Sequence, residues 1–98
     1  MVDRRTERRL RKVAKRLTSA REELRVLDEQ QQYLTDDADS SAVQAMVSDD
    51  GNLAREHRSA VRHAQTAERR RVALRDEVAS LETQQDELLD EMNSLRSE

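Results

Sequence analysis

Five aspartates cluster near the middle of the chain, where their carboxylates could bind a divalent cation. They are Asp36, Asp37, Asp39, Asp49 and Asp50. Oxygen ligands suit Ca²⁺ and Mg²⁺, but the spacing lacks the alternating ligands and closing glutamate of a calcium loop. We therefore expect these residues to cap helices and to keep a turn soluble. We predict neither a metal ion nor a cofactor. An alternative hypothesis is that this acidic tip enters a basic channel or groove of a larger protein.

A short segment beside this cluster resembles the tip motif Gly-Asp-Leu-x-Glu-Asn of bacterial transcript-cleavage factors of the Gre type. The segment reads Asp50-Gly51-Asn52-Leu53-Ala54-Arg55-Glu56. Asn52 stands where the motif has its aspartate and Arg55 where it has its glutamate, so two metal-binding carboxylates are missing. The resemblance implies a shared architecture, an acidic tip on an antiparallel coiled coil. The five aspartates themselves support the alternative function, a regulator that inserts this acidic tip into a basic channel of RNA polymerase or of a ribosome-associated factor.

Cations dominate the N-terminal segment and could contact a polyanion. Six of them lie off the edge that would face a partner helix: Arg4, Arg5, Arg8, Arg11, Lys12 and Lys15. Such a run suits the phosphates of nucleic acid or of an acidic lipid. We favour a structural role instead, because the C-terminal segment 76–91 is acidic and could pair with it. Nucleic-acid binding therefore stays a third hypothesis, and no aromatic residue is available nearby to stack on bases.

The remaining polar residues do not form a recognisable catalytic motif. His57 and His63 are six residues apart, which is not the spacing of a metal pair on one helical face. No serine stands in a nucleophile motif, and a glycine-rich phosphate loop is absent from the sequence. We expect a protein that is not an enzyme.

Composition restricts the fold to one that needs few apolar residues. Of the 98 residues, 40% are charged, 35% are hydrophobic and 1% are aromatic, which is too little for a thick core. Proline is absent and Gly51 is the single glycine, so long helices meet few interruptions. Because a narrow seam with two apolar residues per heptad suffices for a coiled coil, the composition favours that class.

Two heptad repeats support this interpretation. Apolar side chains recur at steps of three, four or seven residues in both halves of the chain. The first series is Leu10, Val13, Leu17, Ala20, Leu24, Leu27 and Leu34. The second series is Leu53, Ala60, Ala64, Ala67, Leu74, Val78, Leu81, Leu88, Met92 and Leu95. Each series predicts a long helix that buries a narrow stripe.

We predict an all-α fold, an antiparallel coiled-coil helical hairpin with a short helix at the tip. Residues 1–98 form one domain, with helices over 3–35 and 53–96. Within the tip, residues 36–52, serine and aspartate favour turns and caps. A short helix over 41–47 would carry Val43, Met46 and Val47 against the alanine-rich seam. Gly51 would end that helix in a left-handed conformation, and Asn52 would cap the next one.

Charge pairing predicts the register between the two helices. The favoured alignment places Leu10 opposite Leu81 and Leu17 opposite Leu74. It also pairs Arg16 with Glu77, Glu23 with Arg70, and Arg21 with Glu68. A slip of one heptad brings like charges together, including Glu23 with Glu77 and Arg21 with Arg75. Each exposed pair contributes only a few tenths of a kcal/mol. Because the three pairs of the favoured alignment are all attractive, together they favour it over the slipped alignment.

That alignment leaves an apolar stripe beyond the end of the first helix. Its members are Leu88, Leu89, Met92 and Leu95. Large apolar side chains in water call for a partner, so we expect a second copy, giving a homodimer, or a dedicated protein partner to cover them. The chain has no cysteine and no stretch apolar enough for a membrane span, and its N-terminus lacks an apolar signal region. We expect a cytoplasmic interaction module, an adaptor or scaffold, that does not contact a membrane.

Overall fold

The computed structural model describes residues 3–97, and the side chains of residues 3–95. It consists of two helices, α1 (Arg4–Val47) and α2 (Gly51–Ser97). They run antiparallel and pack against each other, so the predicted all-α helical hairpin is confirmed. Residues 1, 2 and 98 of the predicted domain lie outside the described range.

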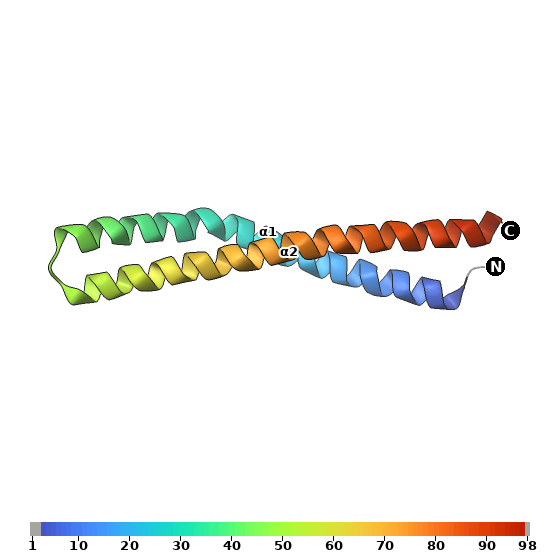
Figure 1. The fold of residues 1–98 in the computed structure, drawn as a ribbon, viewed down its shortest axis with the longest axis horizontal. Helices are drawn as coiled ribbons and strands as arrows, with labels where there is room; N and C mark the ends of the chain where they lie inside the picture. The colour runs from blue at the N-terminus through green and yellow to red at the C-terminus, as the bar shows by residue number, and fades with distance from the viewer. Residues whose placement is uncertain (1–2, 98) are drawn as a thin grey trace. The chain divides into compact units, whose positions relative to one another are not determined.

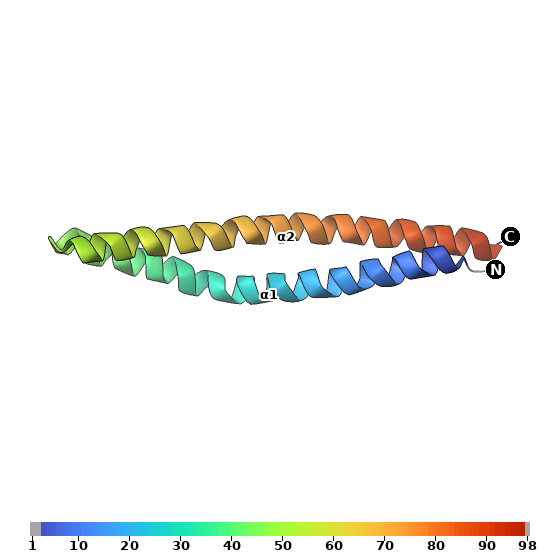
Figure 2. The ribbon, with the colours of Figure 1, turned by 90° about the horizontal axis from the view of Figure 1, so that it is seen from below.

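Contacts in space divide the chain into two compact units. The terminal unit joins Met1–Glu23 to Leu74–Glu98, and the turn unit comprises Leu24–Ala73. In the turn unit, α1 and α2 are joined by a short link, as the green and yellow-green ribbons of Figure 1 show. In the terminal unit, the first turns of α1 lie beside the last turns of α2, in blue and red in Figure 2.

The predicted break at residues 36–52 is wrong for most of its length. Residues 36–47 continue α1 without interruption, so the short separate helix at the tip does not exist. Aspartate and serine in a helix cost only about 0.5 to 0.7 kcal/mol each relative to alanine. Local bonds offset part of that cost, because Gln32 Nε2 donates to Asp36 Oδ1 and Ser41 Oγ donates to the Ala38 carbonyl.

Both helix starts are capped by aspartate. Asp3 Oδ1 accepts a hydrogen bond from the Arg5 amide, at 3.0 Å, and Asp50 Oδ1 accepts one from the Asn52 amide, at 2.9 Å. Asp50 thus takes the capping role that was predicted for Asn52. The left-handed conformation predicted for Gly51 is also wrong, because Gly51 is the first residue of α2 and its φ is not positive.

Cross-helix contacts define a register one heptad away from the predicted one. Thr6 hydrogen-bonds Glu91, Arg71 bonds Asp28, and His57 bonds Ser41. Extended along both helices, the predicted alignment of Leu10 with Leu81 would instead place Thr6 opposite Gln85, Arg71 opposite Ala20 and His57 opposite Leu34. In the observed register Leu17 lies at the level of Leu81 and Leu10 at the level of Leu88, so the predicted partners Leu74 and Leu81 are wrong.

Leucine burial explains why the structure adopts the register that charge pairing disfavoured. The slip lets α1 extend along Leu88, which is only 4% exposed. Burying one large apolar side chain is worth roughly 1.5 to 3 kcal/mol, whereas an exposed charge pair is worth a few tenths. The predicted pair of Arg16 with Glu77 still forms, because Arg16 reaches diagonally across the shifted register. Arg21 pairs with Glu82 instead of the predicted Glu68.

Candidate interaction surfaces

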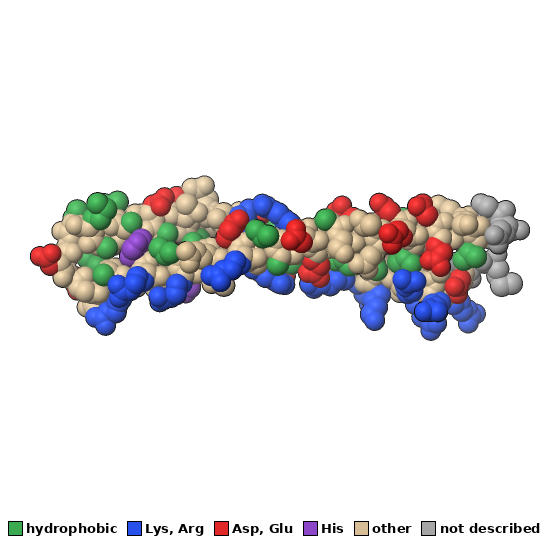
Figure 3. Space-filling model, in the orientation of Figure 1, with side chains coloured by type: hydrophobic (Ala, Val, Ile, Leu, Met, Phe, Trp, Pro, Cys, Tyr) green, Lys and Arg blue, Asp and Glu red, His purple; other side chains and the backbone are tan. Residues whose placement is uncertain are grey.

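The predicted polyanion-binding cations form an outward face of α1 in the terminal unit. All six are exposed: Arg4, Arg5, Arg8, Arg11, Lys12 and Lys15. Steps of three and four residues keep them on one side of the helix. Arg11 lies 3.9 Å from Glu7 of the same helix. The acidic residues of α2 in this unit lie along the other helix, as the blue and red side chains of Figure 3 show.

A groove runs between the two helices of the terminal unit. Its volume is about 580 Å³. Val13, Leu81 and Leu88 form an apolar floor. Its two rims differ in charge, because α1 contributes Arg9, Lys12 and Arg16 while α2 contributes Gln84, Glu87 and Glu91. We call this feature the terminal groove.

Most side chains of the predicted dimer stripe are at least half-buried within the chain itself. Leu88 is buried, Met92 and Leu95 are half-buried, and Leu89 is 41% exposed. The premise that all four extend past α1 is therefore wrong, because the shifted register places α1 beside them. Leu88 instead belongs to the floor of the terminal groove.

The predicted acidic tip residues are all exposed in the turn unit but do not converge on a metal site. Asp36 and Asp50 are engaged locally, by Gln32 and by the Asn52 amide. Among the described residues, no three His, Cys, Asp or Glu side chains are arranged to hold a metal ion. The remaining three, Asp37, Asp39 and Asp49, lie on the surface. They make the end of α1 and the link anionic.

Three apolar side chains are exposed beside these carboxylates at the end of α1. Val43 is 62% exposed, Met46 is 85% exposed and Val47 is 81% exposed. They were predicted to pack against the alanine-rich seam, and that prediction is wrong because residues 41–47 continue α1 with these side chains on its outer face. With Asp39, Asp49 and Asp50 they form what we call the turn surface.

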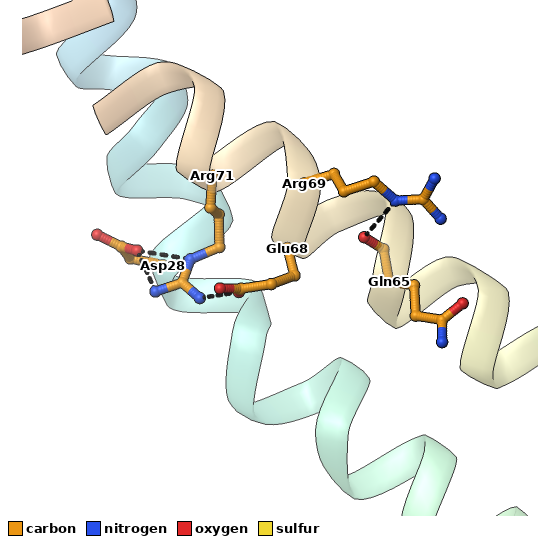
Figure 4. Close-up of polar contacts among 5 residues, drawn as sticks. All are labelled: Asp28, Gln65, Glu68, Arg69 and Arg71. Atoms are coloured by element: carbon orange, nitrogen blue, oxygen red, sulfur yellow. Dashed lines mark hydrogen bonds and ion pairs between the residues drawn. The ribbon is translucent and has the colours of Figure 1, made fainter. Parts of the chain in front are cut away.

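Arg71 occupies a seam position of the turn unit. Its side chain is 13% exposed and bridges two acids (Figure 4). The guanidinium nitrogens lie 2.8 Å from Asp28 Oδ1 and 2.5 Å from Glu68 Oε2. The hydrogen bond to Asp28 is the main cause of a raised pKa for the Arg71 guanidinium, against the opposing effect of desolvation. The cation therefore stays charged and holds one acid on each helix.

Ser41 and His57 form a second cross-helix contact in the turn unit, and its geometry does not fit nucleophilic catalysis. Ser41 Oγ lies 3.0 Å from His57 Nδ1 and 2.9 Å from the Ala38 carbonyl. A hydroxyl carries one proton, and a carbonyl oxygen can only accept. Ser41 thus donates to Ala38, and His57 donates to Ser41 through Nδ1. A base that would activate the serine has to accept at that atom. His63 is exposed.

Sequence reasoning overlooked an alternation of charge along the chain. Residues 28–50 contain seven acids and no lysine or arginine, whereas residues 55–75 contain seven arginines. In the turn unit α1 is therefore acidic and α2 basic, which is the reverse of the terminal unit. Counting charges in blocks would have found this pattern. It gives each unit one helix of each sign.

Comparison of the chain with family models, with curated proteins and with solved structures finds no match. Over the described residues, neither α1 nor α2 contains a stretch apolar enough to span a bilayer.

Proposed function

We propose that the chain is a non-enzymatic protein–protein interaction module, an adaptor or scaffold built on an antiparallel coiled coil. The observation that carries this proposal is the turn surface. Val43, Met46 and Val47 are three neighbouring apolar side chains exposed on one helix face. A chain with so few hydrophobic residues gains no intramolecular stability from leaving them in water. Contiguous exposed apolar side chains rimmed by polar ones are typical of interaction sites.

The negative charges around the turn surface indicate which kind of partner would cover it. Asp39 lies one turn before Val43, and Asp49 and Asp50 follow Val47 in the link. The C-terminal end of a helix adds partial negative charge from its free carbonyl groups. The partner is therefore a protein with an apolar recess bordered by lysine or arginine.

Affinity capture with a matched pair of variants tests this function. Met46→Lys with Val47→Lys removes apolar surface while placing cations where they favour the helix end. Tyr33→Lys with Val72→Lys makes the same change at two other exposed apolar positions of the turn unit. We expect a bound protein, another copy of the chain included, to be lost with the first variant and kept with the second. Equal binding by wild type and both variants would contradict the proposal.

A regulator that inserts its acidic end into a basic channel is the second candidate, supported by the cation-free block 28–50. The two functions differ in which side chains matter. Replacing Asp36, Asp37, Asp39, Asp49 and Asp50 by asparagine removes charge and keeps the apolar side chains. Loss of capture on this change, together with full capture by Val43→Ser and Met46→Ser, would favour the channel regulator over the apolar docking module.

A further inference from the structure

We propose that the turn surface of one copy of this chain docks into the terminal groove of a second copy. This inference rests on the proposed function and names a second copy as the partner. It commits to residues on both sides of the contact: Val43, Met46 and Val47 on one copy, and Val13, Leu81 and Leu88 on the other.

The apolar parts of the two surfaces are complementary in size and exposure. The turn surface projects three apolar side chains from a helix face, and each is more than half exposed. The terminal groove is concave, with about 580 Å³ of space above an apolar floor. A projecting methionine with two flanking valines suits such a recess, because an unbranched thioether side chain adapts to an irregular cavity.

The cationic rim of the groove matches the acidic side of the turn surface. Arg9 and Lys12 are exposed, and within the described part of the chain they form no ion pair, whereas Arg16 is held by Glu77. These two cations are available to Asp39, Asp49 and Asp50 of another copy. Pairs of this kind steer association and set orientation more than they add affinity.

The acidic rim of the groove is matched as well, by the other helix of the turn unit. Glu87 and Glu91 border the groove on α2. The first turns of α2, which lie in the turn unit, carry the exposed arginines Arg55 and Arg58. A docked turn unit can thus place its acidic α1 on the cationic rim and its basic α2 on the anionic rim. The opposite orientation would bring like charges together on both rims.

The contact joins two different surfaces, so each copy offers both halves of it. A pair of copies that makes the contact twice closes into a two-fold dimer, and repetition in one direction gives an open chain. A single contact made through three apolar side chains buries less surface than the roughly 1,200 to 2,000 Å² of a stable interface. We therefore expect weak association, with a dissociation constant on the order of 10 to 100 μM, which is weaker than the μM to pM values of standard-size interfaces.

A mixing experiment with two defective variants tests the proposal. The turn variant carries Met46→Lys and Val47→Lys, and the groove variant carries Arg9→Glu and Lys12→Glu. Each variant repels itself, because lysines meet the cationic rim in the first and aspartates meet an anionic rim in the second. Each should sediment as a monomer at a concentration where the wild type associates. A mixture should associate again, since the turn surface of the groove variant and the groove of the turn variant are both intact.

Matched controls separate this contact from general charge effects. Arg4→Glu with Arg8→Glu changes the charge of α1 equally but outside the groove, and should associate like the wild type. Circular dichroism of every variant checks that the helices remain folded. Failure of the mixture to associate would overturn the docking of turn surface to groove, as would equal weakening by Arg4→Glu with Arg8→Glu.

The outcome also distinguishes this inference from the proposed function. A wild-type chain that stays monomeric at 100 μM, on the order of the weakest affinity expected here, would overturn the self-docking. If its turn surface still captures another protein, the interaction module stands. If it neither associates nor captures a protein through the turn surface, both proposals are wrong.

Discussion

The terminal unit and the turn unit are built from the same two helices but have different interiors. The terminal unit buries Leu17, Leu74, Leu81 and Leu88 to 8% exposure or less. In the turn unit Ala60 is the only apolar side chain buried to that degree among the described residues. Its seam instead contains the Arg71 bridge and the Ser41–His57 contact. The comparison indicates that one unit supplies stability and the other supplies specific polar pairing.

This difference is consistent with where the proposed docking surface lies. Regions with few buried apolar contacts open locally at a lower free energy than leucine-rich ones, and binding elements are often drawn from them. The turn surface belongs to the unit with the thin alanine-rich interior. The terminal groove belongs to the unit with the leucine core. We infer that the adaptable half of the contact is the turn surface and the rigid half is the groove.

The largest expected effect comes from deleting a leucine of the terminal unit. Leu17→Ala should lower the free energy of unfolding by about 2 to 5 kcal/mol, the range for a buried leucine. Leu34→Ala removes a half-buried leucine of the turn unit and should cost clearly less. Urea denaturation followed by circular dichroism measures both values. A cost for Leu34→Ala equal to that of Leu17→Ala would contradict the comparison.

A smaller, opposite effect is expected at Gln31 in the turn unit. Its Oε1 atom is buried and has no hydrogen-bond partner among the residues the structure describes. Removing an unsatisfied buried polar atom relieves a penalty of about 1 to 3 kcal/mol. Gln31→Leu should therefore raise the midpoint of thermal unfolding, while Gln30→Leu, at an exposed neighbouring position, serves as the control. A lower midpoint for Gln31→Leu would show that the amide is satisfied in solution.

The smallest effect concerns the diagonal ion pair of the terminal unit. Both oxygens of Glu77 accept hydrogen bonds from the Arg16 guanidinium, which raises the pKa of Arg16. The pair is solvent-exposed, so Arg16→Glu should reduce thermal stability only slightly, and less in high salt. Combining it with Glu77→Arg should recover most of the loss. A double variant no more stable than Arg16→Glu alone would place the two residues apart in solution.

The sequence predicted the helices and their antiparallel pairing because heptad spacing is a strong signal. The register predicted from charge pairing is wrong because each exposed pair contributes little, whereas burial of Leu88 contributes more. The predicted end of the helix near residues 36–41 is wrong because aspartate and serine lower helix stability only slightly. The exposed turn surface was missed as a consequence, since Val43, Met46 and Val47 face outward only when α1 continues to Val47.

Hydrogen exchange of backbone amides in the native protein tests the central comparison most directly. Exchange reports the free energy of local opening at each helical amide. We predict that amides of α1 at residues 10–21 and of α2 at residues 74–88 exchange slowest. Amides at residues 31–45 and 53–67 should exchange measurably faster at the same pH and temperature. Equal protection in the two units, or slower exchange in the turn unit, would contradict the assignment of stability to the leucine-rich terminal unit.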